Sequence, residues 1–111
     1  MSAAGMPDGE YAIGDLPVVM KGGEARLKDG NALAGSCLTM SGALRYVLAN
    51  TTLTVPEVSR LASGNAAKQL GTYDRTGSIA VGKQADLVLL DGQFHVQNTW
   101  VRGRSVYEKQ S

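Results

Sequence analysis

A chain of 111 residues and 11.6 kDa is about the size of one domain, and it is too short for a closed barrel of eight strands and eight helices, which takes about 250 residues. Eleven Lys and Arg against ten Asp and Glu give a formal charge of +1 with no basic run, which argues against nucleic-acid binding. No apolar stretch approaches the ~20 residues of a membrane span. A single cysteine, Cys37, and the lack of a signal-peptide pattern favour a soluble protein of the reducing cytoplasm.

Short apolar patches separated by glycine turns mark the first part of the chain. After a loop that ends in a turn signal at residues 7–9, two strands are predicted between residues 11 and 27, as a hairpin or small meander. Residues 33–36 show neither a helical nor a strand period. We therefore predict a loop there that enters a helix.

The first predicted helix covers residues 39–50. Its apolar side chains recur at i, i+4, i+7 and i+8 on one face, and these are Met40, Leu44, Val47 and Leu48. Thr39 can cap the start of this helix. The pattern predicts an amphipathic helix that buries one side.

A second helix is predicted from Thr54, where Glu57 completes a capping box. Its buried stripe is Val58, Leu61 and Ala62. Gly64 is expected to interrupt the helix and Asn65 to cap a further short one, which ends at Gly71 in the left-handed conformation. The helical block thus extends to residue 70.

Strand patterns return after Gly77. Residues 78–81 and 85–91 read as strands, and residues 99–101 and 105–107 as a terminal hairpin around the turn at 102–104. Together these elements predict an α+β fold made of a β-hairpin, two to three helices and C-terminal strands.

The residues that could carry hydrolytic chemistry are few. A metal centre needs several imidazoles or carboxylates on one ion, and His95 is the sole histidine, with no second His or Cys at ligand spacing. Cys37 has no base nearby in sequence and is expected to be a small buried apolar residue. Ser36 lies outside any G-x-S-x-G elbow. We predict no catalytic residue and no metal ligand in this chain.

Two other polar or aromatic positions have structural interpretations. Asp86 precedes an apolar run, and its carboxylate either faces solvent or, as we expect, accepts backbone N–H groups of the Gly82–Lys83 turn. Trp100 is expected to pack in a core or an interface.

Two glycine-containing segments could hold an anion. The better one is Ala34-Gly35-Ser36, whose backbone N–H groups approach the start of a predicted helix, so a sugar or phosphate could bind there. The alternative is a helix-entry loop without a ligand. The weaker candidate, Gly22-Gly23, is expected to be only a turn.

One C-terminal segment carries a family resemblance. Residues 77–91, GSIAVGKQADLVLLD, resemble the G-S-I-x-x-G-K-x-A-D-L-V signature of the amidohydrolase superfamily. Three further segments resemble the N-acetylglucosamine-6-phosphate deacetylase family within it, namely AGMPDGEY from Ala4, LAGSCLTMSGALR from Leu33 and LASGNAAKQLG from Leu61.

The resemblance implies a part of a larger fold. Residues 1–76 would form the end of a metal-dependent (β/α)8 barrel, with a hairpin insertion and the last helices, and residues 77–111 the returning strands of a small β-sandwich. The residues after the family's catalytic aspartate resemble residues 1–5, so the chain is expected to begin just after that aspartate. The family's metal ligands lie earlier still, so the zinc or iron of the intact enzyme would not be held by this chain.

The resemblance also implies a substrate. The segment Leu33, Ala34, Gly35 and Ser36 resembles the family's stretch at the substrate sugar, and the intact enzyme would hydrolyse an amino-sugar phosphate to glucosamine 6-phosphate and acetate. The chain alone is expected to be inactive. Two alternatives stay open: a noncatalytic module that self-associates through its apolar helix faces, which favours a homo-oligomer, and a fragment of another amidohydrolase, such as a dihydroorotase or imidazolonepropionase relative.

Overall fold

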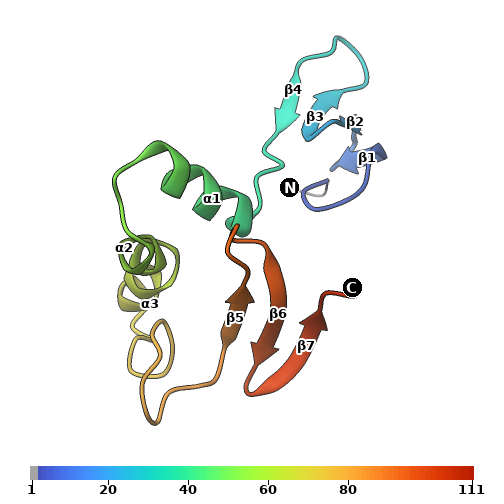
Figure 1. Cartoon of the computed structure of the whole chain (residues 1–111). Helices are drawn as coiled ribbons and strands as arrows, with labels where there is room; N and C mark the ends of the chain where they lie inside the picture. The colour runs from blue at the N-terminus through green and yellow to red at the C-terminus, as the bar shows by residue number, and fades with distance from the viewer. Residues whose placement is uncertain (1–2) are drawn as a thin grey trace. The chain divides into compact units, whose positions relative to one another are not determined.

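The computed structural model describes residues 3–111, so the resemblance that starts at Met1 and Ser2 lies partly outside it. The chain divides into two compact units (Figure 1), of which the first ends at Thr39 and the second runs from Met40 to Ser111. Strands and a few helices occur together, in agreement with the predicted α+β class. The division at residue 76 refers to the larger fold and stays a prediction.

The first unit is an antiparallel meander in the order β1-β2-β3-β4. Its strands are β1 (Gly9–Ile13), β2 (Leu16–Lys21), β3 (Glu24–Leu27) and β4 (Leu33–Gly35). Two strands were predicted before residue 28, but the structure has three, because each glycine turn is followed by a further strand. Gly22 and Gly23 have φ of +59° and +83°, which gives β2 and β3 the tight turn that suits their twist.

One face of this meander is buried and the other is charged. Val18, Met20 and Ala25 are buried together with Ala3, as the period of two along β2 requires. On the opposite face, ion pairs join Arg26 to Glu24 at 2.9 Å and Lys28 to Glu10 at 3.0 Å. These pairs are exposed, so their contribution to stability is small.

The helices of the second unit are α1 (Met40–Asn50), α2 (Val55–Ser59), the π-helical turn η1 (Arg60–Gly64) and α3 (Asn65–Gln69). The predicted capping box is present, because the Glu57 carboxylate accepts the backbone N–H of Thr54 at 2.8 Å and its hydroxyl at 2.7 Å. Gly71 ends α3 with φ of +68°, as predicted.

The prediction of a break at Gly64 was wrong. Gly64 and Asn65 both have right-handed helical angles, and the Asn65 N–H donates to the Arg60 carbonyl, so α2, η1 and α3 form one continuous helical segment in which Asn65 is no cap. Gly64 is buried, and a Cβ there would lie 3.4 Å from the Gly77 carbonyl oxygen. The glycine therefore serves a close packing contact rather than a helix end.

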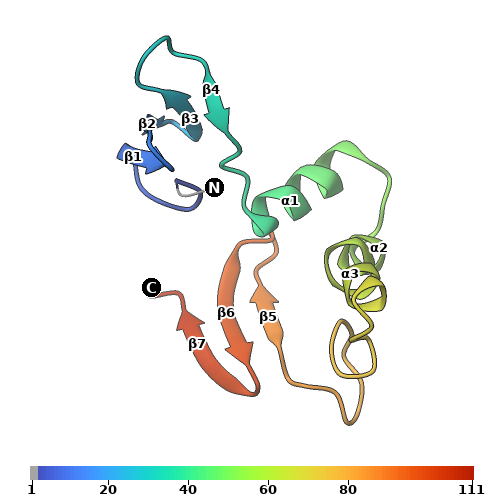
Figure 2. The same ribbon diagram turned by 180° about the vertical axis from the view of Figure 1, so that it is seen from behind.

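The second unit ends in a three-stranded antiparallel sheet, with β5 (Leu87–Leu90), β6 (Val96–Val101) and β7 (Arg104–Glu108) in that order, as Figures 1 and 2 both show. The terminal hairpin is confirmed, with Arg102 and Gly103 at φ of +51° and +76° in its turn. The predicted strand at residues 78–81 is wrong. Ile79 is 90% and Val81 106% exposed, and the segment joins no sheet, because an alternating pattern forms a strand only beside a partner.

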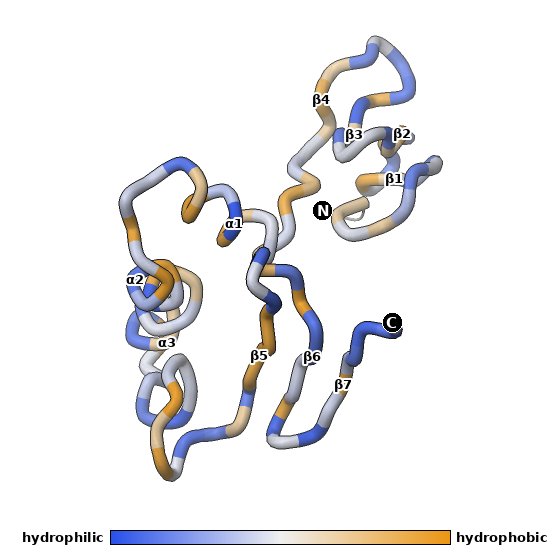
Figure 3. Tube along the Cα trace, in the orientation of Figure 1, coloured by the Kyte–Doolittle hydropathy of each residue, from blue (hydrophilic) through white to orange (hydrophobic). Residues whose placement is uncertain are grey.

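Much apolar surface of the second unit is exposed. Val58 and Ala67 are buried, but Met40 and Leu61 are exposed, and Leu44, Val47 and Leu48 are half-buried. Val88 and Leu89 of β5 are also exposed, and Figure 3 shows this strand as a continuous hydrophobic stretch. Among residues 3–111, no helix is long and apolar enough to cross a membrane.

Candidate functional site

Three residues of the predicted ligand segment form the edge strand β4 rather than a loop, and Ser36 follows this strand. Leu33 pairs with Arg26 and Gly35 with Ala25, across an irregularity between Ala25 and Arg26, and the Ala32 carbonyl accepts the Leu27 N–H at 2.8 Å. The prediction of a loop here was wrong because the partner strand β3, not the local pattern, makes β4 extended. Within the described residues, β4 pairs with β3 along one edge and with no further strand along the other.

The side chains of this segment leave its surface accessible. Leu33 is 67% exposed, Ala34 is half-buried, and Gly35 and Ser36 are exposed. The Ser36 hydroxyl accepts the Leu38 N–H at 3.1 Å, which shapes the exit from the strand. That the backbone N–H groups of residues 34–36 approach the start of α1 stays a prediction.

The weaker glycine candidate is a turn whose amide has a partner. The Gly22 N–H lies 3.2 Å from both carboxylate oxygens of Asp8, so the chain's own carboxylate occupies this donor. The prediction that Gly22-Gly23 forms only a turn is consistent with this contact.

Cys37 was predicted to be a small buried apolar residue, and the structure confirms only part of this prediction. It is half-buried rather than fully buried, lies against the cluster of Ala3, Met20 and Ala25, and places its Sγ 3.2 Å from the Met20 Sδ. Its environment is that of a small apolar residue.

His95 lies in a turn organised by Asp91. The Asp91 carboxylate accepts the backbone N–H groups of His95 and Gln93, both at 2.9 Å, and lies 3.5 Å from the His95 Nδ1. Hydrogen bonds from the His95 and Gln93 backbone lower the pKa of Asp91. Across residues 3–111, no three His, Cys, Asp or Glu side chains lie together as a metal ion would require. The described residues therefore do not fit the divalent metal that the resemblance implies.

Asp86 has the structural role predicted for it, but with another donor. Its Oδ1 accepts the Arg102 backbone N–H at 2.8 Å and its Oδ2 the Gln84 amide at 2.6 Å. The expected donors in the Gly82–Lys83 turn were wrong, because the β6–β7 turn is closer in space. The Arg102 and Gln84 hydrogen bonds lower the pKa of Asp86.

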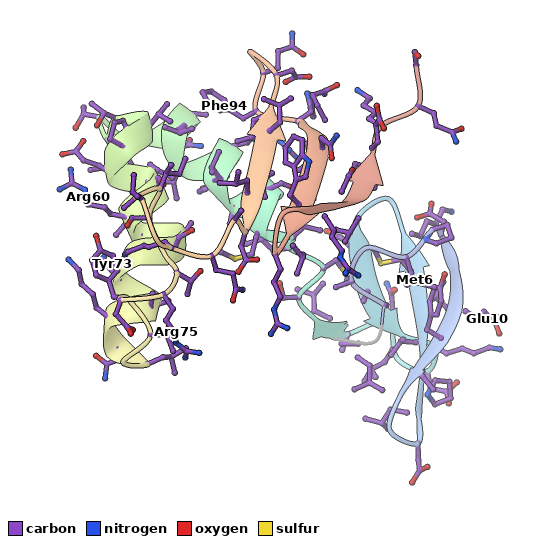
Figure 4. All side chains as sticks on the ribbon, turned by 90° about the horizontal axis from the view of Figure 1, so that it is seen from below. Met6, Glu10, Arg60, Tyr73, Arg75 and Phe94 are labelled. Carbon is purple, nitrogen blue, oxygen red and sulfur yellow. The ribbon has the colours of Figure 1, made fainter. Side chains whose placement is uncertain are left out.

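A polar cluster around Lys83 could not be identified from sequence spacing. The Lys83 ammonium donates to the Tyr73 carbonyl and, at 2.8 Å, to the Ser78 hydroxyl, and it lies 3.6 Å from the centroid of the Tyr73 ring. Figure 4 labels Tyr73 on the helical side of the second unit. A hydrogen bond from Ser78 and the charge of Lys83 lower the pKa of Tyr73. One indication of this cluster was present in the sequence, the Gly82-Lys83 pair of the signature, but there was no indication of the partners of Lys83.

Comparison with known proteins gives a consistent result. The sequence profile of the amidohydrolase family matches residues 26–106. The chain is 41% identical to the N-acetylglucosamine-6-phosphate deacetylase of Bacillus subtilis over 107 residues, which is 96% of this chain and 27% of that protein. It is also 41% identical over 104 residues to an N-acetylgalactosamine-6-phosphate deacetylase of Escherichia coli, covering 94% of this chain and 27% of that protein.

A solved structure is similar over almost the whole chain. N-acetylglucosamine-6-phosphate deacetylase from Thermotoga maritima superposes with a TM-score of 0.82 at 41% identity, over 98% of this chain and 30% of that one. The sequence thus spans between a quarter and a third of the length of these relatives.

Proposed function

Because the chain belongs to the amidohydrolase family, we propose that it forms part of a deacetylase that acts on N-acetylglucosamine 6-phosphate. The observation that carries this proposal is the 41% identity to the Bacillus subtilis enzyme over 96% of the chain. The similarity to the Thermotoga maritima deacetylase extends over nearly the same residues.

The reaction is hydrolysis of the N-acetyl amide. Water adds its oxygen to the acetyl carbon, the C–N bond breaks, and the nitrogen leaves protonated as glucosamine 6-phosphate beside acetate. We propose no step in bond cleavage for this chain, because the resemblance places the family's metal ligands and catalytic aspartate before the residues matched here. The 111 residues alone are expected to show no deacetylation.

The role proposed for this chain is substrate contact through Leu33, Ala34, Gly35 and Ser36. The place of Leu33–Gly35 on an edge strand supports it, since the outer backbone groups of β4 can hydrogen-bond sugar hydroxyls or the acetamido group. The exposed Gly35 leaves room for such an approach, because it carries no side chain.

The place of the chain in the whole fold is also a proposal. Residues 1–76 would close the end of a (β/α)8 barrel, and residues 77–111 would supply strands of a β-sandwich. The exposed apolar strand β5 supports this, since strands rich in Val and Leu on both faces are typical of sheets covered on both sides. The single cysteine supports a cytoplasmic location.

A second substrate is supported by a specific observation. The identity to the N-acetylgalactosamine-6-phosphate deacetylase equals that to the Bacillus subtilis enzyme, at 41%. The two sugars differ in the configuration of one hydroxyl. N-acetylgalactosamine 6-phosphate is therefore the alternative substrate of the same reaction.

Self-association is the second proposed property. The exposed apolar residues of α1 and β5 would be covered if copies of the chain assembled as a homo-oligomer. Self-association would be a property of the 111 residues by themselves, and it is compatible with their being part of a deacetylase.

A chimera tests the proposed activity. The region of the Bacillus subtilis deacetylase that this chain matches is replaced by residues 1–111, and acetate release is measured with both sugar phosphates. We expect deacetylation, with the preferred sugar identifying the substrate. A chimera that melts cooperatively and binds metal but releases acetate from neither sugar contradicts the proposal.

Substitutions in the same chimera test the substrate contact. A Cβ at Gly35 would meet only the Ile13 Cδ1, at an ordinary 3.7 Å, so Gly35→Ala is expected to fold. It is expected to raise KM about tenfold by obstructing the sugar, as about 1.4 kcal/mol of lost binding implies. Gly92→Ala is the matched control, because nothing lies within 4 Å of its Cβ. Equal KM values in both variants contradict the contact.

A further inference from the structure

The segment that joins α3 to β5 is not held by apolar burial. Ile79 and Val81 are almost fully exposed. Its path is fixed instead by backbone hydrogen bonds, among them Gln84 N–H to the Arg75 carbonyl at 2.8 Å and Lys83 N–H to the Ala80 carbonyl at 3.1 Å. These bonds place Gln84 beside Arg75 and so close a compact loop.

The ammonium of the half-buried Lys83 contacts oxygens of this loop. It donates to the Tyr73 carbonyl, to the Thr76 carbonyl at 3.5 Å and to the Ser78 hydroxyl at 2.8 Å. An ammonium has three N–H donors, and these three oxygens use all of them. The Tyr73 ring provides a fourth contact, with its centroid 3.6 Å from the nitrogen.

The oxygens around Lys83 are neutral. Among residues 3–111, no carboxylate forms an ion pair with Lys83, so the charge is met by carbonyl and hydroxyl dipoles and a π face. Carbonyl oxygens of this kind replace the hydration shell of potassium in selective channels. The set of ligands therefore suits a compact monovalent cation.

We propose that Lys83 is a built-in cation that fixes the loop of residues 71–84 through the oxygens of Tyr73, Thr76 and Ser78, and that a free ammonium or potassium ion binds in its place once the side chain is removed. The charge, rather than the aliphatic stem, is then what the loop requires. Because an arginine is planar and larger, Lys83→Arg does not substitute for it.

Hydrogen exchange of the Gln84 amide in the 111-residue chain tests the proposal. Lys83→Ala is expected to speed this exchange about tenfold, since bonds to a charged group are lost. Ammonium chloride and potassium chloride are expected to slow it again, while tetramethylammonium chloride at the same ionic strength is not. Lys21→Ala, an exposed lysine of the first unit, is the control and leaves the exchange unchanged.

Further variants keep the test decisive if Lys83→Ala unfolds. Lys83→Met retains the stem, and in this variant the NMR titration of the Tyr73 phenol is expected to move to higher pH. Ser78→Ala removes one oxygen ligand and is expected to weaken the rescue of Lys83→Ala by ammonium. Unchanged Gln84 exchange in Lys83→Ala and Lys83→Met, or equal rescue by ammonium and tetramethylammonium, overturns the proposal.

Discussion

The Asp86 carboxylate accepts the backbone N–H of Arg102 at 2.8 Å across 16 residues of sequence, and so joins the start of β5 to the β6–β7 turn. A second hydrogen bond, from the Gly103 N–H to the Ala85 carbonyl at 2.9 Å, lies beside it. Two N–H donors of a turn with positive φ are thereby satisfied by the two residues that precede β5. The Asp of the amidohydrolase signature thus has a structural role in this chain.

This contact predicts an acid-sensitive contribution to stability. The pKa of Asp86 lies below its ordinary value of 3.8, so the folded chain binds fewer protons there than the unfolded chain. The stabilisation is present above the ordinary pKa and is lost as the pH falls through the lower, folded-state value. Asp86→Asn is expected to lower the denaturation midpoint at pH 7, with the difference from the native chain shrinking below about pH 4.

Glu57 and Asp91 also have lowered pKa values, so the native chain alone cannot assign the acid effect to Asp86. The comparison of urea midpoints between the native chain and Asp86→Asn at each pH removes their shared contribution. A difference that stays constant from pH 7 to pH 3 would show that the ionised carboxylate is not required.

Gly77 is predicted to be the glycine least tolerant of substitution. It has φ of +86°, and a Cβ would lie 2.5 Å from the Ala67 Cβ. Gly82 has the same φ with nothing within 4 Å, so Gly82→Ala is expected to cost about 1–2 kcal/mol for the left-handed backbone alone. Gly77→Ala is expected to cost about 1–3 kcal/mol more from overpacking, measured by chemical denaturation.

A double variant separates the steric and backbone effects at Gly77. Ala67→Gly removes the obstructing methyl, so its combination with Gly77→Ala is expected to cost less than the sum of the single costs. Strict additivity would mean that the close approach is not what penalises the alanine.

At Phe94, glycine is predicted to destabilise the fold less than alanine, which reverses the usual order of these two substitutions. It has φ of +62° in the turn between β5 and β6, and its carbonyl accepts Arg45 Nη1 at 3.2 Å. Because left-handed angles penalise any side chain, Phe94→Gly is expected to be more stable than Phe94→Ala by about 1 kcal/mol. Thermal unfolding of both variants measures this.

Tyr46 provides the matched control for Phe94. It is an exposed aromatic residue inside α1, where Tyr46→Gly is expected to be less stable than Tyr46→Ala by about 1 kcal/mol. The same order at both positions would contradict a left-handed requirement at Phe94.

Self-association is predicted to depend on β5. Val88 and Leu89 are 56% and 53% exposed, and charged residues on an edge strand oppose pairing. Val88→Lys and Leu89→Lys are expected to lower the mass measured by light scattering at a given concentration. Leu16→Lys, at 57% exposure in the first unit, is the control, and an equal effect there or a monomeric native chain contradicts the prediction.

Local patterns in the sequence determined several elements correctly. The helix at α1, the Thr54–Glu57 capping box, the left-handed end at Gly71 and the terminal hairpin each depend on residues a few positions apart. Such contacts form within one turn or one hairpin, so spacing and residue type suffice to predict them. The signature of residues 77–91 likewise identified the amidohydrolase family.

The tertiary structure decided what depends on partners distant in sequence. Leu33–Gly35 is extended because β3 lies beside it, whereas residues 78–81 have the pattern of a strand without a partner. Gly64 lies within a continuous helical segment, and its role is close packing, since a Cβ there would lie 3.4 Å from the Gly77 carbonyl oxygen. Residue spacing also could not predict the donor to Asp86 or the oxygens around Lys83. Such hydrogen bonds depend on which segments the fold places side by side, and local spacing does not determine that.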